Sequence, residues 1–183
     1  NLYATQYLRD SIDNNGMVIT STVHACSPSS CPFDNAFWSG SQMVYGDAHG
    51  YPLADDVVAH ELTHGVTQYE SNLFYYYQSG AINESLSDVW GEYYDQTNGL
   101  GNDMVGVKWR VGEDILGLNN PTPFPALGLR DMSNPALFND PDRMSSPNYY
   151  LGTGDNGGVH FNSGVNNKAV FLMVDGGIFN GRT

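Results

Sequence analysis

The chain has 183 residues, 40% of them apolar and 13% aromatic, which suffices for one domain or slightly more with a substantial core. Twenty acidic residues against seven basic ones give a formal net charge of −13, which argues against nucleic acid and against an anionic membrane as partners. No apolar run reaches the roughly eighteen residues that a membrane span needs, so no transmembrane helix is predicted.

The first thirty residues predict a helix followed by a strand. Residues 2–10 carry apolar side chains at helical spacing and precede turn residues at 13–16. Residues 17–24 are rich in β-branched side chains and predict a strand. Cys26 and Cys31 follow in a turn-rich segment, where a local disulfide and two free thiols both fit the sequence. A zinc site there is disfavoured, because no second pair of ligands is near.

A histidine motif lies in the helix predicted at about 55–69, after extended structure at 36–45 and a loop at 46–55. His60 and His64 are four residues apart, so both imidazoles lie on one helix face and can reach one zinc ion. Glu61 can then face a water molecule on that zinc. The alternative is a core helix with two packed histidines. The helix has an apolar body, and its buried polar groups need partners, which favours the metal.

A second helical pattern begins at Gly80 and carries two acids, Glu84 and Asp88, on one face at a spacing of four. One carboxylate could complete a catalytic zinc site, which takes three protein ligands, and the other could accept the free N–H of a ligand histidine. Solvated surface acids are the alternative. That alternative is weakened because apolar residues surround the two acids, namely Ile82, Leu86, Val89, Trp90, Tyr93 and Tyr94.

The rest of the chain predicts loops and one more helix. An aromatic cluster occupies 74–77, a glycine- and asparagine-rich stretch runs from 96 to 112, and 119–125 is a proline-containing loop. Residues 141–158 read as a loop that ends in an Asp-Asn-Gly-Gly turn. A helix is predicted at 163–175, with inward-facing Val165, Ala169, Leu172 and Met173.

Four segments resemble the thermolysin-like neutral metalloproteases, a family of secreted zinc endopeptidases. They are NAFWSGSQMVYGD at 35–47, DVVAHELTH at 56–64, GAINE with Asp88 at 80–88, and DNGGVHFNSG at 155–164. They occur in the family's order and cover most of the chain. The resemblance implies that His60, His64 and Glu84 bind one zinc ion, that Glu61 is the general base, and that Asp88 orients His60.

The resemblance also implies residues that hold the substrate. Tyr75 and His160 would donate hydrogen bonds to the oxyanion, with Asp155 holding the other nitrogen of His160. Asn35 and Ala36 would hold an extended peptide by strand-like hydrogen bonds. Arg130, in a segment at 127–135 that resembles the family, would bind the substrate carbonyl beyond the scissile bond. The pocket for the residue after the cut would be lined by Val57, Val111, Ile115 and Leu129, which favours a bulky apolar residue there.

A calcium site is implied at Asp56, Asp95 and Glu113. Lys108 and Arg110 occupy positions that are usually acidic in the family. Their charge should repel a second ion, so one calcium at most is expected, with Asn102 or Asp103 as possible additional ligands. A plain solvated loop is the alternative.

The fold implied by the resemblance is α+β and zincin-like. Residues 1–78 would end a β-rich N-terminal lobe whose zinc helix forms the cleft floor, and 79–183 would begin a helical C-terminal lobe. Family members extend beyond both ends, so a truncated central fragment of a secreted, monomeric protease acting on polypeptides is expected. One alternative is a catalytically inactive module that binds zinc or a partner, although no fourth cysteine or histidine ligand is offered. Another is a zinc hydrolase for a different bond, against which Asn35 and Arg130 favour a polypeptide.

Overall fold

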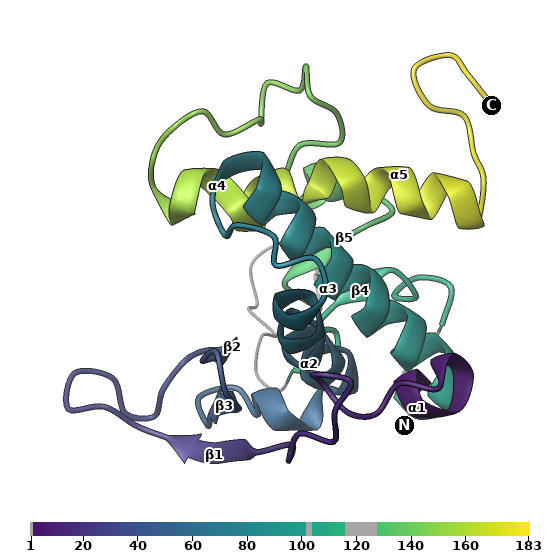
Figure 1. Ribbon diagram of the computed structural model, residues 1–183. Coiled ribbons are helices and arrows are strands. Elements are labelled where there is room, and N and C mark those ends of the chain that lie inside the picture. The colour runs from purple at the N-terminus through teal and green to yellow at the C-terminus, as the bar shows by residue number, and fades with distance from the viewer. Residues whose placement is uncertain (1, 102–103, 116–127) are drawn as a thin grey trace.

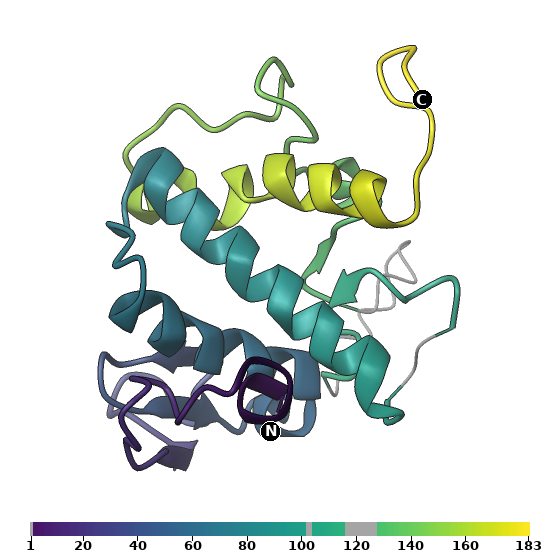
Figure 2. The same cartoon turned by 45° about the vertical axis from the view of Figure 1, so that its right-hand side comes forward.

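The computed structural model describes residues 2–101, 104–115 and 128–183. The predicted loop at 119–125 and the possible calcium ligands Asn102 and Asp103 lie outside these residues. In chain order the elements are α1 (Leu2–Tyr7), β1 (Ser21–Ala25), β2 (Ala36–Trp38), β3 (Met43–Gly46), η1 (Tyr51–Leu53), α2 (Asp55–Tyr69), α3 (Tyr77–Asn98), β4 (Arg110–Val111), β5 (Arg130–Asp131), η2 (Pro135–Phe138), α4 (Asp155–Asn162) and α5 (Gly164–Val174). The small sheet lies beside α2, α4 and α5 lie at the opposite end, and α3 runs between them (Figure 1, Figure 2).

The N-terminal sheet has three strands in the order β1-β3-β2, so β2 is an edge strand. β1 pairs parallel with β3, and β2 pairs antiparallel with β3. The first strand begins at Ser21 rather than at residue 17, because its pairing with β3 starts at Ser21 opposite Met43. The first helix likewise ends at Tyr7 rather than at residue 10, since Leu8 adopts a positive φ of 55°.

The histidine helix α2 spans Asp55–Tyr69, the range predicted from sequence. Asp55 and Asp56 lie in its first turn, where negative charge interacts favourably with the helix dipole. One face of α2 packs against the sheet and η1. The apolar core there consists of Ile12, Ala36, Met43, Tyr45, Tyr51, Ala54, Val57 and Ile115.

The long helix α3 buries a polar face rather than an apolar one. Ile82, Leu86 and Tyr93 are exposed, whereas the buried positions are occupied by small or polar residues, namely Gly80, Ala81, Asn83, Glu84, Ser85, Ser87, Asp88, Gly91, Glu92 and Asp95. Gly91 allows the close approach of α2, because a Cβ atom there would lie 2.7 Å from the carbonyl oxygen of Asp56. The two helices therefore meet through polar groups, which must find partners in each other.

The last helix, α5, departs from the predicted burial. Ala169 and Met173, predicted to face inward, are exposed, and the buried residues of α5 are Gly164 and Asn167. The reason is a polar contact, in which Asn167 Nδ2 donates to Asp88 Oδ2 at 2.8 Å. This hydrogen bond turns the Asn167 side of α5, rather than its apolar side chains, toward α3.

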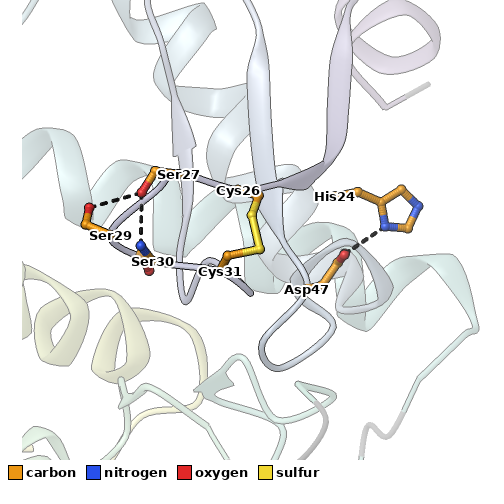
Figure 3. Close-up of a disulfide and its surroundings, with 7 residues drawn as sticks. All are labelled: His24, Cys26, Ser27, Ser29, Ser30, Cys31 and Asp47. Carbon is orange, nitrogen blue, oxygen red and sulfur yellow. Dashed lines mark hydrogen bonds and ion pairs between the residues drawn. A yellow bond between two sulfur atoms is a disulfide. The ribbon is translucent and has the colours of Figure 1, made fainter.

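Cys26 and Cys31 form a disulfide that closes the short loop after β1 (Figure 3). The sequence left this disulfide and two free thiols as alternatives. Beside it, His24 Nδ1 lies 2.8 Å from Asp47 Oδ2 and links the end of β1 to the turn after β3 (Figure 3). Among the described residues, no helix is long and apolar enough to cross a membrane.

Candidate active site

The structure brings together the two histidines of α2 and the first acid of α3. His60 Nε2 lies 3.0 Å from His64 Nε2. Glu84 lies 3.5 Å from the former and 3.3 Å from the latter. Glu84 Oε2 is buried and has no hydrogen-bond partner among the described residues. Two imidazole nitrogens and a carboxylate that converge in this way fit the three-ligand set of a catalytic zinc site.

Neighbouring side chains turn both imidazoles toward this centre. His60 Nδ1 lies 2.9 Å from Asp88 Oδ1. His64 Nδ1 lies 2.8 Å from Asn83 Oδ1 and 3.2 Å from Ser87 Oγ. With each Nδ1 engaged, each Nε2 is left for a metal, the arrangement that fixes ligand orientation in metalloproteins.

Sequence reasoning missed Asn83 and Ser87. The spacing could have indicated them, because Asn83 and Ser87 are four residues apart, as Glu84 and Asp88 are, and each stands one position earlier in the chain. Both pairs therefore share the face of α3 that is turned toward α2.

The charges around His60 favour a cation. Burial alone would lower the pKa of His60, but Asp88 and Glu84 outweigh it and raise that pKa to about 10. For Asp88, burial alone would raise the pKa. The charge of Arg130 and the contact with His60 outweigh burial and hold the pKa of Asp88 well below its usual range. Zinc binding would replace the proton on His60, so the site fits a divalent ion.

Tyr75 and His160 border the same centre. Tyr75 donates its hydroxyl to Glu84 Oε1 and lies 3.2 Å from His160 Nε2. His160 Nδ1 lies 2.6 Å from Asp155 Oδ1, and its backbone N–H donates to Asp155 Oδ2 at 2.9 Å. Burial and the charge of Glu84 raise the pKa of Tyr75, so its hydroxyl stays a hydrogen-bond donor.

A left-handed turn at the start of α4 places His160. Asp155, Asn156, Gly157 and Gly158 all have positive φ, between 49° and 86°. Glycine is required at the third position, because a Cβ atom on Gly157 would lie 2.4 Å from the Tyr77 ring. The Asp-Asn-Gly-Gly sequence thus positions His160 at the mouth of the site.

A cavity of about 660 Å³ opens over the three candidate ligands and is also lined by Glu61, Asn35 and Ala36. Glu61 is buried on α2 next to His60. Asn35 accepts the backbone N–H of Ala36 at 2.9 Å and holds the start of β2 along the cavity wall. The Glu61 carboxylate, the candidate metal ligands and the edge strand β2 therefore all line one cavity.

The other predicted substrate residues lie outside this cavity. Arg130 forms a bidentate ion pair with Asp88, at 2.9 and 2.6 Å. The four predicted pocket residues are packed in the interior: Val57 and Ile115 belong to the apolar core, Leu129 packs against it, and Val111 is buried. None of these four side chains is among the residues that line the cavity, although Val57 lies one helical turn before His60 and Glu61 on α2.

A second cluster of acids lies at the N-terminal end of α2. Asp56, Glu92 and Glu113 are buried, and each offers a carboxylate oxygen within 4.8 Å of the others. Asp95, predicted as a calcium ligand, is also buried but does not belong to this cluster. Glu92 was missed; it lies one helical turn after Asp88, on the α3 face that meets α2.

Burial raises the pKa values of all three acids, and neighbouring carboxylates raise them further: Asp55 acts on Asp56, and Asp56 acts on both Glu92 and Glu113. The pKa of Asp56 rises to about 6, that of Glu113 to about 8, and that of Glu92 lies well above its usual value. Glu92 Oε1 and Glu113 Oε2 have no hydrogen-bond partner within the described part of the chain. Buried oxygens of this kind fit a hard cation such as calcium.

The two predicted repelling cations point to other acids. Lys108 Nζ lies 3.0 Å from Asp175 Oδ1, and Arg110 Nε donates to Asp131 Oδ2 at 3.3 Å. Each ion pair links the segment around β4 to a more C-terminal element.

Comparisons with known proteins agree on one family. Residues 1–68 match the family profile "Thermolysin metallopeptidase, catalytic domain", and residues 71–182 match "Thermolysin metallopeptidase, alpha-helical domain". A bacillolysin from Brevibacillus brevis is 47% identical over 92% of this chain and 29% of its own length. A thermolysin from Alicyclobacillus acidocaldarius is 44% identical over 98% of this chain and 31% of its own.

One solved structure similar to the chain is the precursor of protealysin, a metalloproteinase from Serratia proteamaculans. It superposes with a TM-score of 0.75 and 36% identity, over 93% of this chain and 54% of that one. The chain spans about 30% of the length of the curated relatives it matches. The match confirms the family and the α+β, zincin-like fold predicted from sequence. With profile matches that together cover almost every residue, the chain belongs to the thermolysin metallopeptidase family.

Proposed function

We propose that this chain carries the catalytic centre of a secreted, monomeric zinc endopeptidase that cleaves polypeptides. The observation that supports it most is the convergence of His60, His64 and Glu84 beneath a cavity that also contains Glu61. Bound zinc would polarise the scissile carbonyl and lower the pKa of water toward about 7.

The protein groups would then move protons and stabilise charge. Glu61 takes a proton from the attacking water and delivers it to the leaving amine. Tyr75 and His160 donate hydrogen bonds to the oxyanion, and Asp155 keeps His160 oriented for this task. Asp88 and Asn83 hold the two ligand imidazoles.

The substrate is proposed to lie as an extended strand along Asn35 and Ala36, with Arg130 binding a carbonyl beyond the scissile bond. A bulky apolar residue after that bond is proposed, because Val57, Val111, Ile115 and Leu129 are all aliphatic. Cleavage profiling that showed a preference for acidic residues there would contradict this part.

One structural calcium ion is proposed at the buried acids, with Asp56 and Glu113 as ligands. Glu92 replaces Asp95 in our assignment, because its oxygen lies in the cluster. Lys108 and Arg110 are each within reach of another acid and offer no ligand for a second ion.

Replacing Glu61 by glutamine tests the assigned base. We expect Glu61→Gln to bind zinc normally but to cleave a quenched peptide with an apolar residue after the scissile bond at least about a hundredfold more slowly. His64→Ala should lose zinc, as measured by equilibrium dialysis. Glu70→Gln, the same change at the residue that follows α2 and lies outside the cavity lining, is the control and should behave as the parent.

The outcomes separate the proposals. Normal cleavage by Glu61→Gln would show that another group is the base. A folded, zinc-loaded parent that cleaves nothing would favour the zinc-binding module, whereas cleavage abolished by a chelator would establish the endopeptidase.

A further inference from the structure

Gln68 stands on α2 four residues after His64, so both side chains leave the same helix face. Its side chain lines the cavity together with the edge strand β2. Gln68 Oε1 accepts the indole N–H of Trp38 at 2.8 Å, and Gln68 Nε2 donates to the carbonyl oxygen of Gly40 at 3.2 Å. One amide group therefore bonds the last residue of β2 and the turn that follows it.

A second contact between α2 and β2 reinforces this bridge. Gly65 is next to His64 in the chain and lies close to the Trp38 ring, because a Cβ atom at Gly65 would come within 3.2 Å of Trp38 Cη2 and 2.9 Å of Ile12 Cγ2. The indole thus contacts α2 at Gly65, while its N–H is held by Gln68. Gly40 is the turn residue, with a φ of 94° that favours glycine.

The strand that Gln68 holds is β2, the strand to which an extended substrate is proposed to add. Among the described residues β2 pairs only with β3, and all three of its residues line the cavity. An edge strand of this kind can pair with an added chain. A peptide that adds to this edge can reach the candidate zinc ligands in register only if β2 keeps a fixed distance from α2.

We propose that Gln68 is a positioning residue that clamps the edge strand β2 to the helix bearing the candidate zinc ligands, and so sets the register of an extended polypeptide. The proposal rests on the proposed endopeptidase function for the identity of the ligand. The clamp itself rests on the two hydrogen bonds of Gln68.

The first measurement is hydrogen exchange of the backbone amides at 36–40 in the zinc-loaded protein. Gln68→Ala should speed exchange there relative to the parent, and Gln68→Glu, which keeps the acceptor for Trp38 but loses the donor to Gly40, should fall between them. Tyr69→Ala is the control, because that exposed side chain leaves the helix about 100° away. Unchanged exchange in Gln68→Ala would overturn the clamp.

The second measurement is binding in the Glu61→Gln background, so that turnover does not interfere. A labelled octapeptide of alternating alanine and leucine is long enough to pair with β2, whereas leucine hydroxamate binds only at the metal. Gln68→Ala should weaken octapeptide binding about three- to tenfold, because the peptide would then have to order β2 as it binds, at a cost similar to one ordinary hydrogen bond. Hydroxamate binding should not change.

Equal weakening of both probes, or of neither, would overturn the positioning role. Absence of octapeptide binding by zinc-loaded Glu61→Gln would overturn it too. Failure of the parent to cleave peptides would instead count against the proposed function, while exchange and octapeptide binding still decide the clamp.

Discussion

Each candidate zinc histidine has one ring nitrogen engaged by a side chain from α3. For His60 that partner is Asp88, itself held by Arg130 and Asn167. For His64 it is Asn83, a neutral amide. The two ligands are thus held differently: carboxylates raise the pKa of His60, whereas the neutral amide of Asn83 orients the His64 ring without adding charge.

Asn83→Ala should lower zinc affinity about tenfold to a hundredfold, because the His64 ring would lose its main orienting partner. Competition with a zinc-binding dye measures this. Asn98→Ala, at the other end of α3, removes an asparagine that donates to Asp55 and should leave zinc affinity unchanged. Equal zinc affinity in Asn83→Ala and the parent would show that Ser87 suffices to orient His64.

At the level of elements, regular periodicity located α1, α2, α3 and α5 but did not show which face α3 and α5 bury, and α4 begins at Asp155, within the range 141–158 that was predicted as a loop. The range 55–69 follows from local signals, namely acids in the first turn and apolar residues at helical spacing. The start of β1 depends on pairing with β3 more than twenty residues later in the chain, which no local pattern encodes. Glu92 was missed for the same reason, since its partners Asp56 and Glu113 come from other elements.

The turn at 155–158 should be sensitive to the addition of a single methyl group at Gly157. Gly157→Ala should destabilise the fold by about 2 to 4 kcal/mol, through a strained positive φ and a clash with Tyr77. Because His160 follows the turn, catalysis should fall further than the unfolded fraction explains. Gly99→Ala is the control: its φ is also positive but no atom lies within 4 Å, so about 1 to 2 kcal/mol is expected. Chemical unfolding that gave equal losses for both variants would contradict the clash.

At the scale of the whole molecule, three elements meet at the buried acids. Asp56 comes from α2, Glu92 from α3 and Glu113 from the segment after β4. These acids repel one another, and the chain's net charge of −13 adds a general electrostatic repulsion. A bound cation would join these elements. The family resemblance implies a calcium site at Asp56, Asp95 and Glu113, whereas the structure groups Glu92, and not Asp95, with the other two acids.

Without calcium, stability should fall as the pH rises from about 4 to 8. The pKa of Asp56 rises from 3.8 to about 6 and that of Glu113 from 4.5 to about 8 on folding. The folded chain therefore binds more protons than the unfolded chain in this window, and each proton lost costs stability. Calcium at a hundred times its dissociation constant should raise the melting temperature at pH 8 by about 5 to 10 °C.

The check is scanning calorimetry at pH 5 and pH 8, with and without calcium and with zinc kept saturating throughout. Glu92→Gln provides the matched variant, because it removes one charge from the cluster while keeping its size. It should flatten the pH dependence of the calcium-free protein and shrink the calcium response together, since repulsion and cation binding share the same carboxylates. A calcium response that survived in full in Glu92→Gln would place the ion elsewhere and return Asp95 to the ligand set.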